Sequence, residues 1–193
     1  MFIKTFDTLP STNLYLKENY QNLLDQTIII AKHQTEGKGR LDNIWYDDGH
    51  SALFSILIKK NLDHIDLHLI TLKIAKLMHQ FFAPDLPEIT IKWPNDLYIH
   101  DKKLSGILTQ TMYEHKNLKA LIIGVGINVS NQSFHPSIID RATSLYLETK
   151  NVYDIEPLII SLSKHLLLHL FTPSDDVISY CNKYLAFKNQ IIT

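Results

Sequence analysis

The sequence predicts an α+β protein, and three observations lead to that class. Its 193 residues fit one domain, or one domain and a fragment. With 45% hydrophobic and 20% charged residues, its composition is that of a globular protein, which excludes a disordered or fibrous chain. Strand patterns come first and helical patterns gather at the end. This order favours α+β over a doubly wound sheet, in which strands and helices alternate strictly.

The first part of the chain predicts three strands and one short helix. Residues 2–6 form the first strand, and Pro10-Ser11-Thr12-Asn13 offers helix-capping side chains before a helix that runs to about Glu18. The β-branched run 27–32 predicts a buried strand. A polar loop then occupies residues 33–50 and leads into an apolar strand over residues 52–58.

The rest of the chain predicts a helix, a group of strands and two further helices. Apolar residues recur at helical spacing between 66 and 82, and Pro84 stops the pattern. Four strands are expected after it, over residues 89–93, 97–100, 105–113 and 118–128. A helix is expected over residues 155–170, and a third amphipathic helix begins near Pro173-Ser174-Asp175.

Charge and cysteine content narrow the function classes. The formal net charge is −1, so nucleic acid is not an expected partner. The one cysteine, Cys181, cannot form an intrachain disulfide, and no apolar run approaches the roughly 18 residues that span a bilayer. The first residues do not lead into an apolar signal core. We therefore expect a soluble, cytoplasmic protein without a membrane partner.

The loop that follows residue 32 carries the first candidate site. In Gly37-Lys38-Gly39-Arg40, two glycines flank a cation and a second cation follows. Glycines let backbone N–H groups approach an anion, and Lys38 and Arg40 supply positive charge. The spacing is neither that of a P-loop nor that of a dinucleotide fingerprint. The pattern predicts anion binding, although a flexible surface loop with incidental charges has the same composition.

The second candidate site is a turn between two strands, at Lys92-Trp93-Pro94-Asn95-Asp96. Proline fixes its own φ, and the Asn and Asp side chains close such a turn, so the turn presents its side chains rigidly. Asp96 is a candidate Mg²⁺ ligand, directly or through water, or else it only caps the hairpin.

Two further segments complete the candidate residues. Lys103 begins the next strand and reaches either solvent or a cleft, and Gly106 leaves room for a ligand. Gly124-Val125-Gly126-Ile127-Asn128 ends a strand with two glycines and an amide, which indicates either a nucleotide contact or a bulge.

Together these segments resemble the biotin protein ligase family in order and spacing, over nearly the whole chain. The resemblance rests on Ser11-Thr12-Asn13, Gln34, Gly37-Lys38-Gly39-Arg40, Trp45, Lys92-Trp93-Pro94-Asn95-Asp96, Lys103-Leu104-Ser105-Gly106 and Gly126-Ile127-Asn128. It implies a mixed, largely antiparallel sheet with helices packed on one face, similar to class II aminoacyl-tRNA synthetases. It also implies a catalytic domain over residues 1–183, with residues 184–193 starting a truncated SH3-like barrel and no DNA-binding domain before it.

The resemblance further implies a two-step reaction. The carboxylate of biotin attacks the α-phosphate of ATP in the presence of Mg²⁺, and a lysine of a biotin carboxyl carrier protein then attacks the biotinyl-5′-adenylate. Lys103 and Arg40 would be the catalytic residues. The residues implied for biotin are Ser11, Thr12, Asn13, Gln34, Gly37, Lys38, Gly39, Arg40, Lys103 and Gly106. Those implied for ATP are Lys38, Arg40, Trp45, Asn95, Asp96, Lys103 and Asn128. Family members are often homodimers.

The chain departs from the family pattern in the glycine loop and at Gln110. The family loop commonly reads Gly-Arg-Gly-Arg-Arg-Gly-Arg, whereas residues 37–43 here have lysine at the first arginine and lose later charges. Lysine keeps the charge but not the bidentate geometry, so we predict weaker retention of the adenylate. A carboxylate often stands where this chain has Gln110.

Two alternatives belong to other classes. A lipoate or octanoate ligase of the same fold would carry an Arg-Arg-x-Ser-Gly-Gly-Gly signature, which this sequence lacks. A non-catalytic biotin sensor is compatible with the altered loop. The spacing of His64 with His68, and of His165 with His169, lacks the further ligands of a zinc site, so no structural metal is expected.

Overall fold

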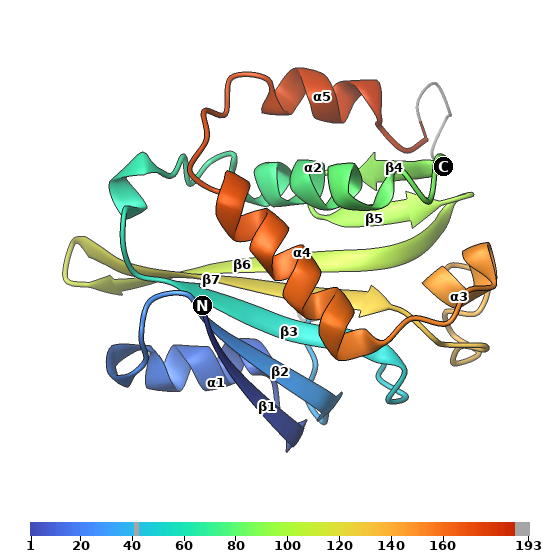
Figure 1. Cartoon of the computed structure of the whole chain (residues 1–193), viewed down its shortest axis with the longest axis horizontal. Helices are drawn as coiled ribbons and strands as arrows, with labels where there is room; N and C mark the ends of the chain where they lie inside the picture. Colours follow the sequence, from blue (N-terminus) through green and yellow to red (C-terminus); the bar gives the residue numbers. More distant parts are fainter. Residues whose placement is uncertain (41–42, 188–193) are drawn as a thin grey trace.

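The computed structural model describes residues 1–40 and 43–187 of the chain, and it contains one seven-stranded sheet (Figure 1). The strands are β1 (Phe2–Leu9), β2 (Thr27–Gln34), β3 (Ser51–Ile58), β4 (Ile89–Lys92), β5 (Asp96–Ile99), β6 (Lys102–Glu114) and β7 (Asn117–Asn128). The helices are α1 (Thr12–Asn19), α2 (Ile70–Phe82), α3 (Leu145–Thr149), α4 (Ile155–His169) and α5 (Val177–Lys183), with short 3₁₀ turns η1 (Tyr20–Asn22) and η3 (Leu62–His64).

The order of strands across the sheet is β1-β2-β3-β7-β6-β5-β4. The β1–β2 pair is parallel and all the other pairs are antiparallel. The long β6–β7 hairpin therefore lies at the centre, with the N-terminal strands on one side and the β4–β5 hairpin on the other. The α+β class and the mixed, largely antiparallel sheet are confirmed.

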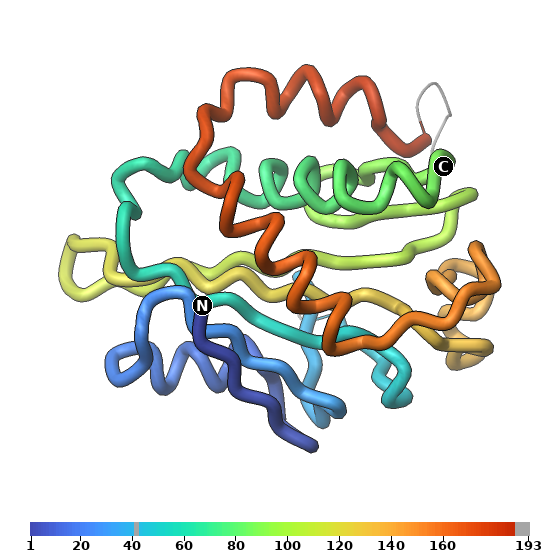
Figure 2. Tube along the Cα trace, viewed as in Figure 1, coloured from blue at the N-terminus to red at the C-terminus, as the bar shows by residue number. Residues whose placement is uncertain are grey.

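One detail of the expected architecture is wrong: the helices do not all lie on one face. In β2, Ile28 and Ile30 face the core under α2, α4 and α5, whereas Ile29 and Ala31 face the core under α1. Figures 1 and 2 show α1 apart from the other helices. Because every residue of β3 is buried, both faces of the sheet centre need a cover. The unbroken apolar runs of these two strands are typical of strands buried on both faces.

Some element boundaries differ from the expected ones. Helix α2 begins at Ile70 rather than Asp66, because the Asp66 carboxylate accepts the His68 N–H at 2.9 Å and closes a turn before the helix. Helix α5 begins at Val177, with Asp176 at its N-cap position. The one-turn helix α3 was not predicted; Ser144 caps it by accepting the Leu147 N–H at 3.1 Å.

The end of the described chain covers one edge of the sheet. Leu185 pairs in parallel with Ile91 of β4, and the Ile91 N–H donates to the Tyr184 carbonyl at 2.8 Å. Figure 2 shows this segment running beside β4. The predicted start of a barrel at residues 184–193 lies mostly outside the described residues, and it stays a prediction.

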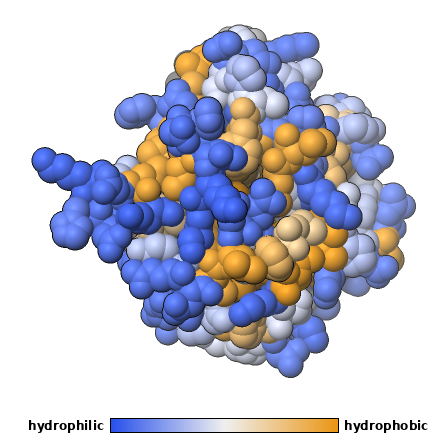
Figure 3. Space-filling model, turned by 60° about the vertical axis from the view of Figure 1, so that its left-hand side comes forward, coloured by the Kyte–Doolittle hydropathy of each residue, from blue (hydrophilic) through white to orange (hydrophobic). Residues whose placement is uncertain are grey.

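The surface is mixed in character. Several large apolar side chains are exposed, among them Val152 and Leu168, and Figure 3 shows apolar patches among hydrophilic side chains on one face. Scattered exposed apolar residues are normal on globular proteins. No helix among residues 1–40 and 43–187 is long and apolar enough to cross a membrane.

We expect His79 to make the stability of the fold depend on pH. The buried ring lies between the Ile89 carbonyl, 3.1 Å from Nε2, and the Tyr180 hydroxyl, 3.0 Å from Nδ1. The carbonyl can only accept, so the neutral ring donates from Nε2 and accepts at Nδ1. Burial lowers the pKa of His79 below its ordinary value of 6.5, so the unfolded chain takes up this proton first as the pH falls.

The free energy of unfolding should therefore decrease as the pH drops below about 6.5. Urea denaturation between pH 7.5 and pH 5 should show this decrease in the wild type and a smaller one in His79→Gln. Some dependence should remain in the variant, because burial also lowers the pKa of His165. Equal pH dependence in the two proteins would contradict the assignment.

Candidate functional site

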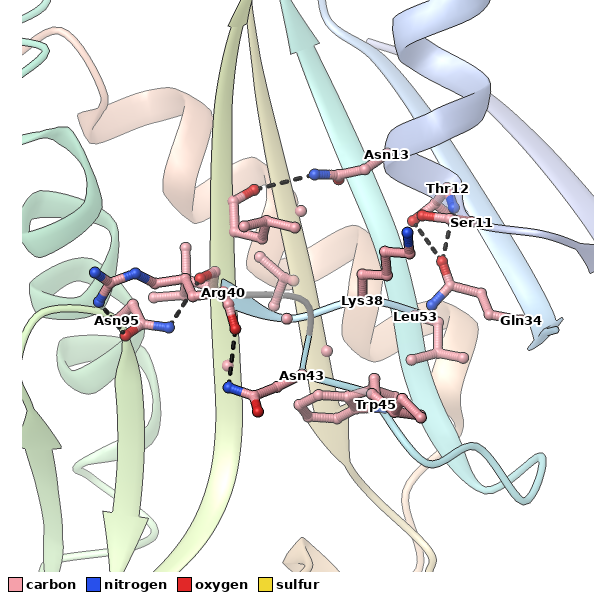
Figure 4. A pocket seen from close by; sticks show the side chains of 18 of the residues that line it. Ser11, Thr12, Asn13, Gln34, Lys38, Arg40, Asn43, Trp45, Leu53 and Asn95 are labelled. Atoms are coloured by element: carbon pink, nitrogen blue, oxygen red, sulfur yellow. Dashed lines mark hydrogen bonds between the residues drawn. The ribbon is translucent and has the colours of Figure 1, made fainter. Parts of the chain in front are cut away.

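The glycine loop forms a tight turn at the edge of a cavity. The Gly39 N–H donates to the Asn43 carbonyl at 2.7 Å, and the Trp45 N–H donates to the Gly37 carbonyl at 2.9 Å. Figure 4 shows Lys38 pointing toward the α1 end of the cavity, whereas Arg40 turns the other way and donates to Asn95 Oδ1 at 3.2 Å. The predicted charge changes at Leu41 and Asp42 lie outside the described residues.

The cavity itself has a volume of about 260 Å³ and lies over β6 and β7. Of the sequence-predicted residues, Gly37 and Asn128 are absent from its lining, and all the others contribute to it. Gly37 lies behind the lining, where an added Cβ would be 3.2 Å from the Trp45 carbonyl oxygen and 3.3 Å from Gln34 Nε2. The structure thus brings together residues that are far apart in the sequence.

The end of the cavity next to α1 is lined by uncharged polar side chains, and Lys38 points toward it. Ser11 is the N-cap of α1 and accepts the Leu14 N–H, which confirms the predicted cap. Gln34, at the end of β2, accepts the Thr12 N–H at 2.7 Å through Oε1, and the Thr12 hydroxyl lies 3.1 Å from the same atom. Figure 4 shows the Ser11, Thr12 and Gln34 side chains gathered at this end.

A buried carboxylate, which no sequence motif indicated, holds this end in place. Only 3% of the Asp47 side chain is exposed. Its two oxygens accept the Gln34 N–H at 2.7 Å and the Gly49 N–H at 2.8 Å. Asp47 therefore ties the loop that carries Trp45 to the strand end that carries Gln34.

The other end of the cavity is charged. Lys103 Nζ lies 2.8 Å from Asp96 Oδ1, and both side chains are largely buried. Asn95 Nδ2 donates to Asp96 Oδ1 at 3.0 Å and to the Ile107 carbonyl at 3.2 Å, which fixes the turn against β6. The rigid turn thus places the Asp96 carboxylate against Lys103. A charge-assisted contact of this kind holds the lysine in one orientation.

Trp45 lies across the two central strands. Glycines make this possible, because a Cβ at Gly126 would be 2.8 Å from the indole and a Cβ at Gly106 would be 3.2 Å from it. Lys103 Nζ is 5.8 Å from the ring centroid. Trp45 Nε1 is buried, and no described residue accepts a hydrogen bond from it.

A second cavity of about 660 Å³ adjoins the first one at Trp45. Trp45 and Lys103 line both cavities, and Tyr46, Tyr98 and Arg141 belong to the second one. Tyr98 ends the second candidate segment, Lys92 to Tyr98, although the sequence suggested no role for it. Sequence reasoning missed Tyr46 and Arg141, since neither belongs to a motif.

Asn128 belongs to this second cavity as well. Its Nδ2 donates to the Lys103 carbonyl at 3.3 Å and to the Thr143 carbonyl at 2.9 Å. The amide nitrogen therefore fixes the backbone behind Lys103, which is a different contact from the predicted one to a nucleotide. Its predicted role in ATP binding stays a prediction.

Within residues 1–40 and 43–187, no group of three or more His, Cys, Asp or Glu side chains could hold a metal ion. Asp96 is the carboxylate that lies in the charged end of the first cavity. A single carboxylate suits an ion that brings its own waters and phosphate ligands, rather than a resident metal.

Comparison with known proteins agrees with this arrangement. The bifunctional ligase/repressor BirA of Bacillus subtilis is 31% identical over 86% of this chain and 55% of its own length, and the biotin–protein ligase of Schizosaccharomyces pombe is 34% identical over 63% of this chain and 23% of its own. The chain thus spans about half the length, or less, of these curated relatives.

The solved structures lead to the same group of proteins. The biotin protein ligase from Aquifex aeolicus in complex with biotin and ATP superposes with a TM-score of 0.82 at 26% identity, over 96% of this chain and 79% of that one. A sequence model described as the Biotin/lipoate A/B protein ligase family matches residues 5–128, which is more than half of the chain. On this match the chain belongs to the biotin/lipoate A/B protein ligase family.

Proposed function

We propose that this chain activates biotin with ATP and transfers the biotinyl group to a lysine of a biotin carboxyl carrier protein. The observation that carries the proposal is the first cavity, which joins a hydrogen-bonding end beside α1 to an end that holds the Lys103–Asp96 ion pair. Biotin has the same two ends, a ureido ring and a carboxylate. The relative from Schizosaccharomyces pombe and the solved structure from Aquifex aeolicus, which support the proposal, are biotin protein ligases by name, and that structure holds biotin and ATP.

In this proposal the ureido ring lies against Ser11, Thr12 and Gln34, whose hydroxyl and amide groups match its polar atoms. The aliphatic chain of biotin then runs past Leu53, which also lines the cavity. Its length brings the carboxylate toward Lys103. Gly106 leaves space beside the lysine, since an added Cβ there would be 3.1 Å from Lys103 Nζ.

Lys103 is the residue that we propose for catalysis. A carboxylate oxygen of biotin attacks the α-phosphate of ATP, a P–O bond forms, and pyrophosphate leaves with the electrons of the broken bond. Two anions repel each other during this step, and a fixed cation between them stabilises the charge on the reacting oxygens. Asp96, 2.8 Å from Nζ, orients the lysine, so little reorganisation is needed. Arg40 supplies a second cation from the glycine loop.

ATP would occupy the second cavity, with its α-phosphate at Lys103, which lines both cavities. Trp45, where the two adjoin, offers a face for the adenine. Asp96 would hold the Mg²⁺ that accompanies the phosphates, and the ion would offset phosphate charge. These assignments to ATP and Mg²⁺ are proposals.

Transfer to the acceptor lysine is tested by intact mass. We expect the chain, with ATP, Mg²⁺ and biotin, to add one biotinyl group to a recombinant biotin carboxyl carrier domain, and to add none when the acceptor lysine is replaced by arginine. Adenylate formation without transfer would limit the function to activation. Biotin binding without pyrophosphate release would identify a sensor instead.

Because the glycine loop carries Lys38, we expect the adenylate to dissociate faster from this chain than from a ligase with the full arginine loop. Lys38 presents one point charge where arginine would present a planar fork. We expect the variant Lys38→Arg to retain biotinyl-adenylate longer after gel filtration, as measured by mass. Equal retention by the wild type and the variant would contradict this reading of the loop.

A further inference from the structure

Asn13 has all its polar atoms engaged within the protein. Its Nδ2 donates to the Leu108 carbonyl at 3.2 Å and to Gln110 Oε1 at 3.0 Å, so both amide hydrogens are used. Its Oδ1 lies 2.6 Å from Ser55 Oγ, which is fully buried. Asn13 therefore has no donor left for a ligand, although it lines the cavity.

The strand beneath Asn13 is shaped to fit it. A Cβ added at Gly124 of β7 would be 2.1 Å from Asn13 Oδ1 and 2.8 Å from Cγ. The amide thus lies directly on the backbone of β7. With Ser55 on β3 and Gln110 on β6, it connects the start of α1 to three central strands.

Ser55 also determines what Thr12 can offer. The serine has one hydroxyl proton, and Asn13 Oδ1 can only accept, so the proton goes to Asn13. Thr12 Oγ1 lies 2.7 Å from Ser55 Oγ and 3.1 Å from Gln34 Oε1, and its own proton must serve one of those two acceptors. The Thr12 hydroxyl then has lone pairs, and no proton, available to a ligand.

We propose that Ser55 and Gln110 are positioning residues that make Thr12, at the α1 end of the cavity, an acceptor for ligand N–H donors. This inference rests on the proposed function and deepens it, because it names the basis of substrate choice. The ureido ring of biotin has two N–H groups, whereas the dithiolane ring of lipoate has none. A lipoate ring would leave buried acceptors unpaired, which a site of this kind rejects strongly.

Calorimetric titrations of the full chain with biotin alone and with ATP alone test this inference. We expect Ser55→Ala and Gln110→Leu to weaken biotin binding by about tenfold, the usual effect of removing one buried hydrogen-bond partner. ATP binding should stay within about twofold. Gln110→Glu keeps an acceptor for Asn13 Nδ2 and should bind biotin like the wild type. In a competition experiment, the ratio of lipoate to biotin that displaces half of the bound biotin should be lower for Ser55→Ala than for the wild type.

Ser163→Ala is the matched control. Ser163 is a fully buried serine of α4, in the helix layer away from the cavity, and its Oγ has no partner among the described residues. This variant should bind biotin and ATP like the wild type.

Three results would overturn the inference. They are unchanged biotin binding in Ser55→Ala and Gln110→Leu, a parallel loss of biotin and ATP binding, and a loss in Gln110→Glu as large as in Gln110→Leu. If the wild type binds biotin but forms no adenylate, the proposed function fails while this inference is still decided by the binding data. If the wild type does not bind biotin, both are wrong.

Discussion

Replacing Lys103 by methionine should lower the rate of biotinyl-adenylate formation by about 10²- to 10³-fold, the usual effect of removing one preorganised group that stabilises the reacting charge. Methionine keeps much of the length of the side chain but not its charge. Asp96, now without its partner at 2.8 Å, would also repel the incoming carboxylate and phosphate. Single-turnover formation of the adenylate, followed by quenching and mass detection, measures this rate.

Two further variants make the result specific. Lys102→Met changes the neighbouring lysine, which is exposed and does not line the cavity, and its rate should stay near that of the wild type. The second variant, Asp96→Asn, keeps the lysine but removes the carboxylate that orients it, and its rate should fall as well. A rate within about threefold of the wild type in Lys103→Met would contradict the proposed role of this lysine.

The second large effect is expected from Gly124→Ala. The new methyl group would overlap Asn13 and push its amide off β7, which breaks the contacts to Ser55 and Gln110. Overpacking of this kind costs about 1–3 kcal/mol, so the melting temperature should fall. Biotin binding should weaken more than ATP binding, because Thr12 lies next to the displaced residue. Thermal melts and calorimetry measure the two effects.

The double variant Gly124→Ala with Asn13→Ala separates the clash from the lost hydrogen bonds. Removing the Asn13 amide should restore part of the thermal stability, since the added methyl group then has space. Biotin binding should stay weak, because Ser55 loses its acceptor Asn13 Oδ1 and its hydroxyl proton is free to go to Thr12. Recovery of both properties would show that the polar contacts of Asn13 do not matter for binding.

The sequence predicted the strands from their apolar and β-branched runs, and it predicted α2 and α4 from an apolar helical period. Turn and glycine motifs indicated Lys38, Arg40, Asn95 and Asp96, and the family resemblance indicated Ser11, Thr12, Asn13, Gln34 and Trp45; all of these line the cavity. Ser11, for example, caps its helix as expected, and Asn95 and Asp96 lie in the expected turn. The position of α1 on the second face was missed, although the unbroken apolar run of β3 indicates burial on both sides.

The rest depends on contacts between distant segments. In the sequence, Asp47 is one of several polar residues in a polar loop. Only the fold places its carboxylate against the Gln34 backbone. Ser55 reads as a small residue in a buried strand, and its partners Thr12 and Asn13 are more than forty positions away. Local periodicity contains no signal for such contacts, so these residues were found only in the structure.

Pyrophosphate release by the wild-type chain tests the central claim most directly. The chain is incubated with ATP and Mg²⁺ alone, with biotin, or with lipoate, and pyrophosphate and the acyl-adenylate are measured together. We expect pyrophosphate release that depends on biotin and matches the biotinyl-adenylate formed, with lipoate at the level of ATP alone. Release with lipoate and not with biotin, or no release with either, would contradict this expectation.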